Sequence, residues 1–134
     1  MANDFEVAVD VAAAPAAVWA LAGDPGQVGE WFAPVTDCVM EGDIRRATMA
    51  SGAVLVERIV DHDDASRSYS YTVLEGIPGL TSHRATLRVE EAPGGSRVLW
   101  RQTATSDVPD YDIEARLRGV MTAGLENLRD RVEG

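Results

Sequence analysis

The last fifth of the sequence is one long amphipathic segment that follows an extended run of strand-like segments. Apolar or small residues recur in it every three or four positions, at Ile113, Leu117, Val120, Met121, Gly124, Leu125, Leu128 and Val132. This spacing predicts a single helix, opened by Pro109 and Asp110 and roughly 30 Å long at about 1.5 Å per residue. Because only one face of such a helix is apolar, it must bury that face against a large sheet.

Strand-like segments separated by short turns precede this helix. They are predicted at residues 35–41, 44–49, 53–61, 67–75, 82–91 and 96–106. Near the N-terminus, residues 4–12 alternate between apolar and polar side chains, which predicts a further strand. The short connections favour hairpins, so we expect a seven-stranded antiparallel sheet.

Two short helices are predicted after the first strand. Pro15 stands where the first turn of a helix tolerates proline, and Trp19 follows at helical spacing. Asp24 before Pro25 is typical of a helix N-terminus, and this second segment continues to Phe32. The predicted order of elements is β-α-α-β6-α, which is an α+β fold.

The charged residues exclude several classes of function. The chain carries 12 basic and 22 acidic residues, a net charge of −10, which disfavours binding to nucleic acid or to an anionic membrane. All 12 basic residues are arginine, which excludes a Schiff-base lysine and a phosphate-loop lysine. Cys38 is the only cysteine, so no internal disulfide can form.

The remaining global features predict a simple organisation. At 134 residues we expect a single domain over residues 1–134. We find neither a signal peptide nor the roughly 20 consecutive apolar residues that a membrane span needs. We therefore expect a cytoplasmic protein without membrane insertion. No residue pattern points to a metal or cofactor, and the acidic stretch around His62 is interpreted as a solvated turn.

The order of elements resembles the helix-grip fold of the START and Bet v 1-like (SRPBCC) superfamily, and within it the polyketide cyclase/dehydrase-like family. The resemblance covers the whole chain and is carried by residues 14–19, 31–32, 56–59, 71–78, 84–89 and 95–100. It implies a curved seven-stranded sheet wrapped around the C-terminal helix, with an internal cavity between them. Because the family includes binders, transporters, cyclases and lyases, the resemblance does not name the ligand.

Strand parity predicts which side chains face the interior. The inward positions are expected to be Tyr69, Tyr71 and Val73, then His83, Ala85, Leu87 and Val89, and finally Val98, Trp100, Gln102 and Ala104. Within residues 53–61, parity leaves open whether Glu57 or Arg58 faces inward, and the resemblance favours Glu57.

The predicted site places polar groups in an apolar chamber. Glu57, His83 and Gln102 are expected beside Tyr71 and Trp100. The other candidate ligand-binding residues are Trp31 at the mouth, Tyr69, Val73, Ala85, Val120, Met121 and Gly124. A buried carboxylate needs a partner, and His83 is the candidate partner of Glu57. Gly124 is predicted to widen the cavity, with close helix packing as the alternative.

Three functions are compatible with this site. The first is binding of a hydrophobic or aromatic, polyketide- or lipid-like molecule by a monomer or weak homodimer. The second is cyclase or dehydratase chemistry in which Glu57 or His83 is the general base and Tyr71 or Gln102 steadies an enolate oxygen. The third is association with another protein through the outer surface, where the sequence shows no obvious apolar patch.

Overall fold

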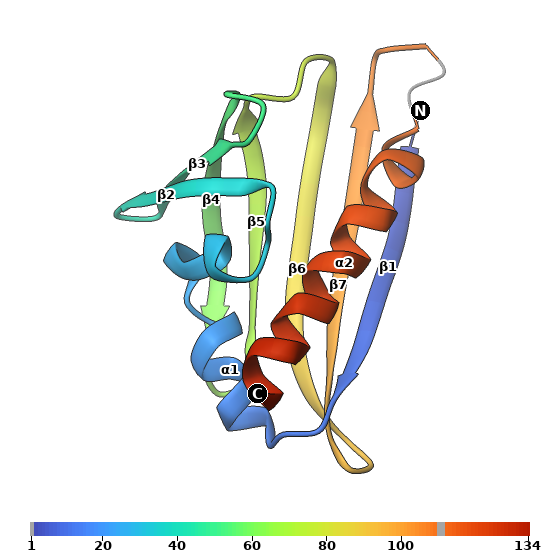
Figure 1. The fold of residues 1–134 in the computed structure, drawn as a ribbon. Helices are drawn as coiled ribbons and strands as arrows, with labels where there is room; N and C mark the ends of the chain where they lie inside the picture. The colour runs from blue at the N-terminus through green and yellow to red at the C-terminus, as the bar shows by residue number, and fades with distance from the viewer. Residues whose placement is uncertain (1, 110–111) are drawn as a thin grey trace.

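A seven-stranded antiparallel sheet curves around the C-terminal helix in the computed structural model, which describes residues 2–109 and 112–134 (Figure 1). The strands are β1 (Ala2–Val11), β2 (Val35–Glu41), β3 (Ile44–Met49), β4 (Val54–Asp63), β5 (Ser68–Glu75), β6 (Leu80–Ala92) and β7 (Gly95–Ser106). Their order across the sheet is β1-β7-β6-β5-β4-β3-β2, so β2 to β7 form a continuous meander and β1 pairs with the last strand. The predicted α+β architecture is confirmed.

The helices are α1 (Pro15–Ala22), η1 (Pro25–Glu30) and α2 (Ile113–Glu133). The second short helix is a 3-10 helix, and it begins where the sequence predicts because the Asp24 side chain accepts a hydrogen bond from the Gly26 amide at 2.9 Å. The long helix begins later than predicted, because Asp112 caps it by accepting from the Ala115 amide at 3.1 Å. Asp110 lies outside the described residues.

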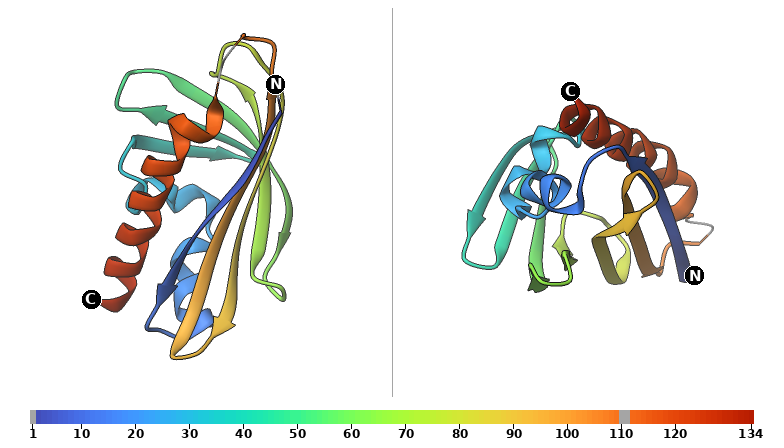
Figure 2. Two further views of the ribbon diagram at one scale, coloured as in Figure 1. Left: turned by 90° about the vertical axis from the view of Figure 1, so that its right-hand side faces the viewer. Right: turned by 90° about the horizontal axis from the view of Figure 1, so that it is seen from below.

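All helices lie on the concave side of the sheet. Figure 2 shows α2 running along this side, with α1 and η1 beside it. The contacts of α2 with the sheet are mainly with β1, while η1 contacts β2 and β3. Because α2 has few contacts with the central strands, the interior between them is filled by side chains.

None of the described helices is long and apolar enough to cross a membrane.

The predicted strands agree with the observed ones to within two residues at each end, but the predicted turn around His62 is wrong. β4 continues through Asp63, because its pairing with β5 shifts between Val60 and Asp63. The His62 ring stacks on Tyr69 with 6.0 Å between ring centroids, and its Nε2 lies 2.7 Å from the Gly23 carbonyl oxygen. Parity cannot foresee such a shift in register.

Two glycines of α2 make a matched test of how closely the helix packs. A Cβ atom on Gly119 would meet open space, whereas one on Gly124 would lie 2.7 Å from Cδ1 of Phe32. We expect Gly119→Ala to raise the free energy of unfolding by about 0.5–1 kcal/mol, because alanine is the better helix former. Gly124→Ala should lack this gain, because the Phe32 ring must move. Denaturant unfolding measures both values, and equal stabilisation by the two changes would contradict this packing.

Candidate functional site

A cavity of about 150 Å³ lies between α2, the segment around η1 and strands β2 to β7. Most of its wall is apolar and consists of Val28, Phe32, Pro34, Val35, Ala47, Met49, Leu55, Val73, Ile77, Trp100, Leu117, Val120 and Met121. The polar groups in the wall are Arg45, Glu57, Tyr71, His83 and Gln102. An apolar cavity of this volume holds a molecule about the size of benzene.

The partly exposed residues of this wall are mostly apolar. Met49 at the end of β3, Ile77 between β5 and β6, and Leu117 and Val120 on α2 are only partly buried. Among the polar wall residues, only His83 shares this partial exposure. Apart from His83, the polar groups of the wall are therefore screened from solvent.

A buried ion pair forms one side of the polar wall. Arg45 on β3 and Glu57 on β4 are direct partners in the antiparallel register and point to the same face. Their side chains are almost completely buried, with 2% and 5% of the residue exposed, and Arg45 Nε donates to Glu57 Oε1 at 2.8 Å. Arg45 Nη1 also donates to the Pro25 carbonyl oxygen at 3.0 Å and to the Tyr69 hydroxyl at 3.3 Å. The guanidinium carbon lies 4.8 Å from the centroid of the Tyr71 ring.

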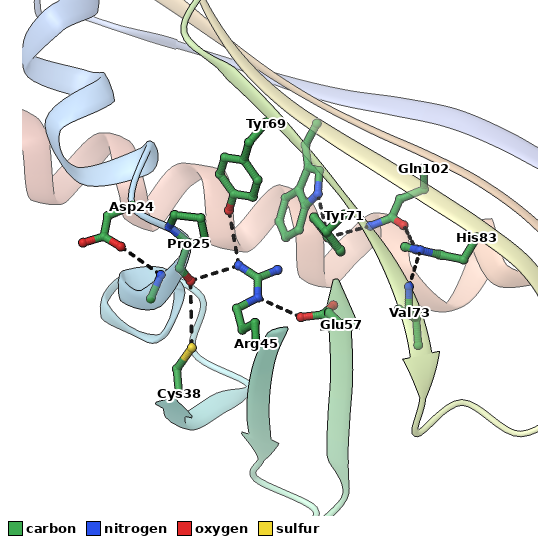
Figure 3. A network of polar contacts seen from close by, with 12 residues as sticks. Asp24, Pro25, Cys38, Arg45, Glu57, Tyr69, Tyr71, Val73, His83 and Gln102 are labelled. Atoms are coloured by element: carbon green, nitrogen blue, oxygen red, sulfur yellow. Dashed lines mark hydrogen bonds and ion pairs between the residues drawn. The ribbon is translucent and has the colours of Figure 1, made fainter. Parts of the chain in front are cut away.

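A chain of hydrogen bonds forms the other side (Figure 3). The backbone amide of Val73 donates to His83 Nδ1 at 3.1 Å, and His83 Nε2 lies 2.6 Å from Gln102 Oε1. The Gln102 amide nitrogen donates to the Tyr71 hydroxyl at 3.4 Å, and the Trp100 indole nitrogen donates to the same oxygen at 3.1 Å. The Tyr71 hydroxyl on β5 thus receives two hydrogen bonds from β7, across the intervening strand β6.

Burial sets the protonation of the groups in this chain. It lowers the pKa of His83, and the hydrogen bond to Gln102 only partly opposes this effect. Burial also raises the pKa of Tyr71, and the nearby negative charge of Glu57 raises it further. At neutral pH, His83 is therefore an uncharged ring and Tyr71 keeps its hydroxyl proton.

The structure brings most of the predicted site residues together around this cavity. Those on its wall are Glu57, Tyr71, Val73, His83, Trp100, Gln102, Val120 and Met121. The alternative left open by parity in β4 is resolved, because Glu57 faces inward while Arg58 lies exposed on the opposite face. The wall therefore combines residues from β4, β5, β6, β7 and α2.

Four predicted residues lie off the cavity wall. Trp31 is only 1% exposed and packs edge-on against Phe32 and Trp100, so its placement at the mouth is wrong. Tyr69 is buried beneath the Arg45 guanidinium. Ala85 is paired with Tyr71 and Gln102 on the neighbouring strands, and its short side chain does not reach past theirs.

Gly124 does not widen the cavity, contrary to the sequence-based prediction. A side chain there would meet the Phe32 ring, and it is Phe32 that lines the cavity. Close packing, the alternative interpretation of this glycine, is what the structure has. The helical periodicity places Gly124 on the apolar face of α2 but cannot show which neighbour covers it.

Sequence reasoning missed Arg45, and with it the partner of Glu57. The expected pair of Glu57 with His83 does not form, because Glu57 binds Arg45 and His83 binds Val73 and Gln102. A signal was present in the β3–β4 hairpin. The turn centred on residue 51 puts residue 45 opposite residue 57, so an inward carboxylate already implied an inward guanidinium.

Comparisons with known proteins agree with this architecture. A family model described as polyketide cyclase/dehydrase and lipid transport matches residues 2–133. No curated protein sequence matches the chain.

Several solved structures share the fold. An uncharacterized protein from Bacillus thuringiensis is 21% identical, with a TM-score of 0.86 over 98% of both chains. The Zhui aromatase/cyclase from a Streptomyces species is 18% identical, with a TM-score of 0.84 over 99% of this chain and 94% of that one. Ara h 8.0201 is 19% identical, with a TM-score of 0.78 over 98% of both chains. At such identities the likeness shows the helix-grip fold alone.

The buried ion pair gives a stability prediction. Glu57→Leu leaves the Arg45 guanidinium buried without its carboxylate and should lower the free energy of unfolding by about 3–5 kcal/mol. The double variant Arg45→Met with Glu57→Leu should recover most of this loss. Denaturant unfolding of the single and double variants gives the coupling between the two positions. The exposed pair of Glu41 and Arg46 is the control, and Glu41→Leu should have little effect. Additive losses at positions 45 and 57 would contradict the pairing.

The lowered pKa of His83 predicts how stability depends on pH. The unfolded chain takes up a proton near the ordinary value of 6.5, while the folded protein resists protonation to a lower pH. Stability is therefore fully present above pH 6.5 and falls as the pH is lowered, by at most about 1.4 kcal/mol per pH unit. Thermal unfolding of His83→Gln should show a weaker decline between pH 6.5 and pH 5 than the wild type. Parallel pH profiles would show that burial does not shift this histidine.

Proposed function

The chain belongs to the polyketide cyclase/dehydrase and lipid transport family, and we propose that it binds one small apolar molecule in the cavity beneath α2. The observation that carries this proposal is an apolar cavity of about 150 Å³ whose few polar groups converge on one region of the wall. Ligand sites are commonly built in this way, because apolar contacts supply affinity and a few polar groups fix the orientation.

The cavity limits the size of the ligand. A volume near 150 Å³ takes one aromatic ring or a short alkyl chain. A polyketide- or lipid-like molecule would therefore place one ring or one chain end inside and leave the rest at the mouth, between Met49, Ile77 and Leu117.

Binding is favoured over cyclase or dehydratase chemistry by the state of the two candidate bases. The Nδ1 lone pair of His83 is occupied by the Val73 amide, so this ring has no free site for a substrate proton. A general-base role would fall to Glu57 alone, and one of its oxygens is held by Arg45. Binding requires no reactive group and uses the same residues as they stand.

Filling the cavity tests the proposal. Ala47 lines it from β3 and is almost completely buried, so Ala47→Phe would place a ring in the space where the ligand is proposed to lie. We expect calorimetric or NMR titration with toluene to show saturable binding to the wild type and at least a tenfold weaker affinity for this variant. The fold should persist, because the added ring occupies existing space.

Arg46→Phe is the matched control for this experiment. Arg46 precedes Ala47 on β3, and its exposed side chain points to the opposite face of the sheet. The control should bind toluene like the wild type. Unchanged affinity in folded Ala47→Phe would show that the probe binds elsewhere and would overturn the proposal.

A further inference from the structure

In the hydrogen bonds beside the cavity, the backbone amide of Val73 determines which group donates and which accepts at every later step. An amide N–H can only donate, so the bond from Val73 fixes His83 Nδ1 as the acceptor. The proton of the uncharged His83 ring is then on Nε2, which donates to Gln102 Oε1. This bond orients the Gln102 side chain, so its NH₂ group faces the Tyr71 hydroxyl and donates to it.

The series of hydrogen bonds ends at Tyr71, whose hydroxyl proton is not used as a donor within the described residues. The Trp100 indole nitrogen also donates to the Tyr71 oxygen, and an indole N–H cannot accept in return. Two donors therefore point at this oxygen, and its own O–H bond must turn away from both. No described residue accepts that proton in a hydrogen bond. Because Tyr71 lies on the cavity wall, the hydroxyl can offer its proton to a molecule in the cavity.

The charges next to Tyr71 restrict the ligand further. Arg45 and Glu57 are joined as an ion pair and together contribute no net charge to the wall. An anionic ligand would gain from Arg45 but would be repelled by Glu57, and a cation would meet the reverse. A neutral ligand meets neither penalty.

We infer that Tyr71 is the specificity-determining residue of the cavity, and that the ligand is a neutral molecule whose carbonyl or similar oxygen accepts the Tyr71 hydroxyl proton. This inference rests on the proposed function, because it concerns the same cavity. It goes further by assigning Gln102 a positioning role, since the orientation of its amide holds the Tyr71 hydroxyl in the donating state.

The test compares two probes of nearly the same shape. Acetophenone carries a carbonyl oxygen, and isopropenylbenzene has a CH₂ group in its place. We expect Tyr71→Phe to weaken acetophenone binding by about threefold to tenfold, the usual range for one neutral hydrogen bond, and to leave isopropenylbenzene binding unchanged. Using the ratio between variant and wild type cancels the different hydration of the probes. The infrared C=O stretch of bound acetophenone should also lie at lower wavenumber in the wild type than in Tyr71→Phe.

Two further variants separate a direct from a structural effect. Tyr69→Phe removes a hydroxyl two residues away on the same strand that does not line the cavity, so the ratio of the two affinities should stay as in the wild type. Gln102→Glu would replace the donating amide with an acceptor, and the Tyr71 hydroxyl would turn toward it. Acetophenone should then lose its advantage and its infrared shift even though Tyr71 is present.

The outcomes distinguish this inference from the proposed function. Equal weakening of both probes by Tyr71→Phe, or an unshifted carbonyl band in the wild type, would overturn the role of Tyr71 while leaving the binding function intact. Failure of both probes to bind the wild type would overturn the proposed function, and the inference with it.

Discussion

The ion pair between Arg45 and Glu57 is the interaction on which the arrangement of the cavity depends. A guanidinium inside an apolar interior is costly unless its donors are used, and Arg45 uses them on three separate elements. Its bond to the Pro25 carbonyl fixes the start of η1 against β3, and the segment after η1 supplies Phe32 to the cavity wall. The same pair therefore closes one side of the site and makes that side electrically neutral.

The sequence predicts the fold well because each strand and helix shows its own periodic pattern of apolar residues. Alternation along the strands and the three-to-four spacing in α2 place every element within a few residues, since both patterns follow from the geometry of a single segment. The inward faces of β5, β6 and β7 follow from the same parity, and the structure buries Tyr71, Leu87 and Trp100 accordingly. The exception in β4 at His62 comes from a register shift, which alternation cannot show.

The site is predicted less completely because it depends on contacts between segments. Which ring covers Gly124 is decided by where the chain leaves η1, and no pattern within α2 carries that information. Trp31 and Phe32 are neighbours in sequence, yet the first is core and the second is wall. Arg45 was within reach, because the hairpin geometry pairs it with Glu57 once the inward face of β4 is chosen.

The two polar clusters have complementary effects on what the cavity can hold. Arg45 and Glu57 neutralise each other in the ion pair, so the two charges offer little net attraction to a charged ligand. In the hydrogen-bond chain from Val73 to Tyr71, the backbone amide donates to His83, His83 donates to Gln102, and Gln102 donates to the Tyr71 hydroxyl. The Tyr71 O–H group is left as the donor at the end of this chain. In a chain of this kind each hydrogen bond polarises the next. With Tyr71 as the inferred donor, an interior this small would gain selectivity from the direction of a single hydrogen bond, with no net charge to draw in water or ions.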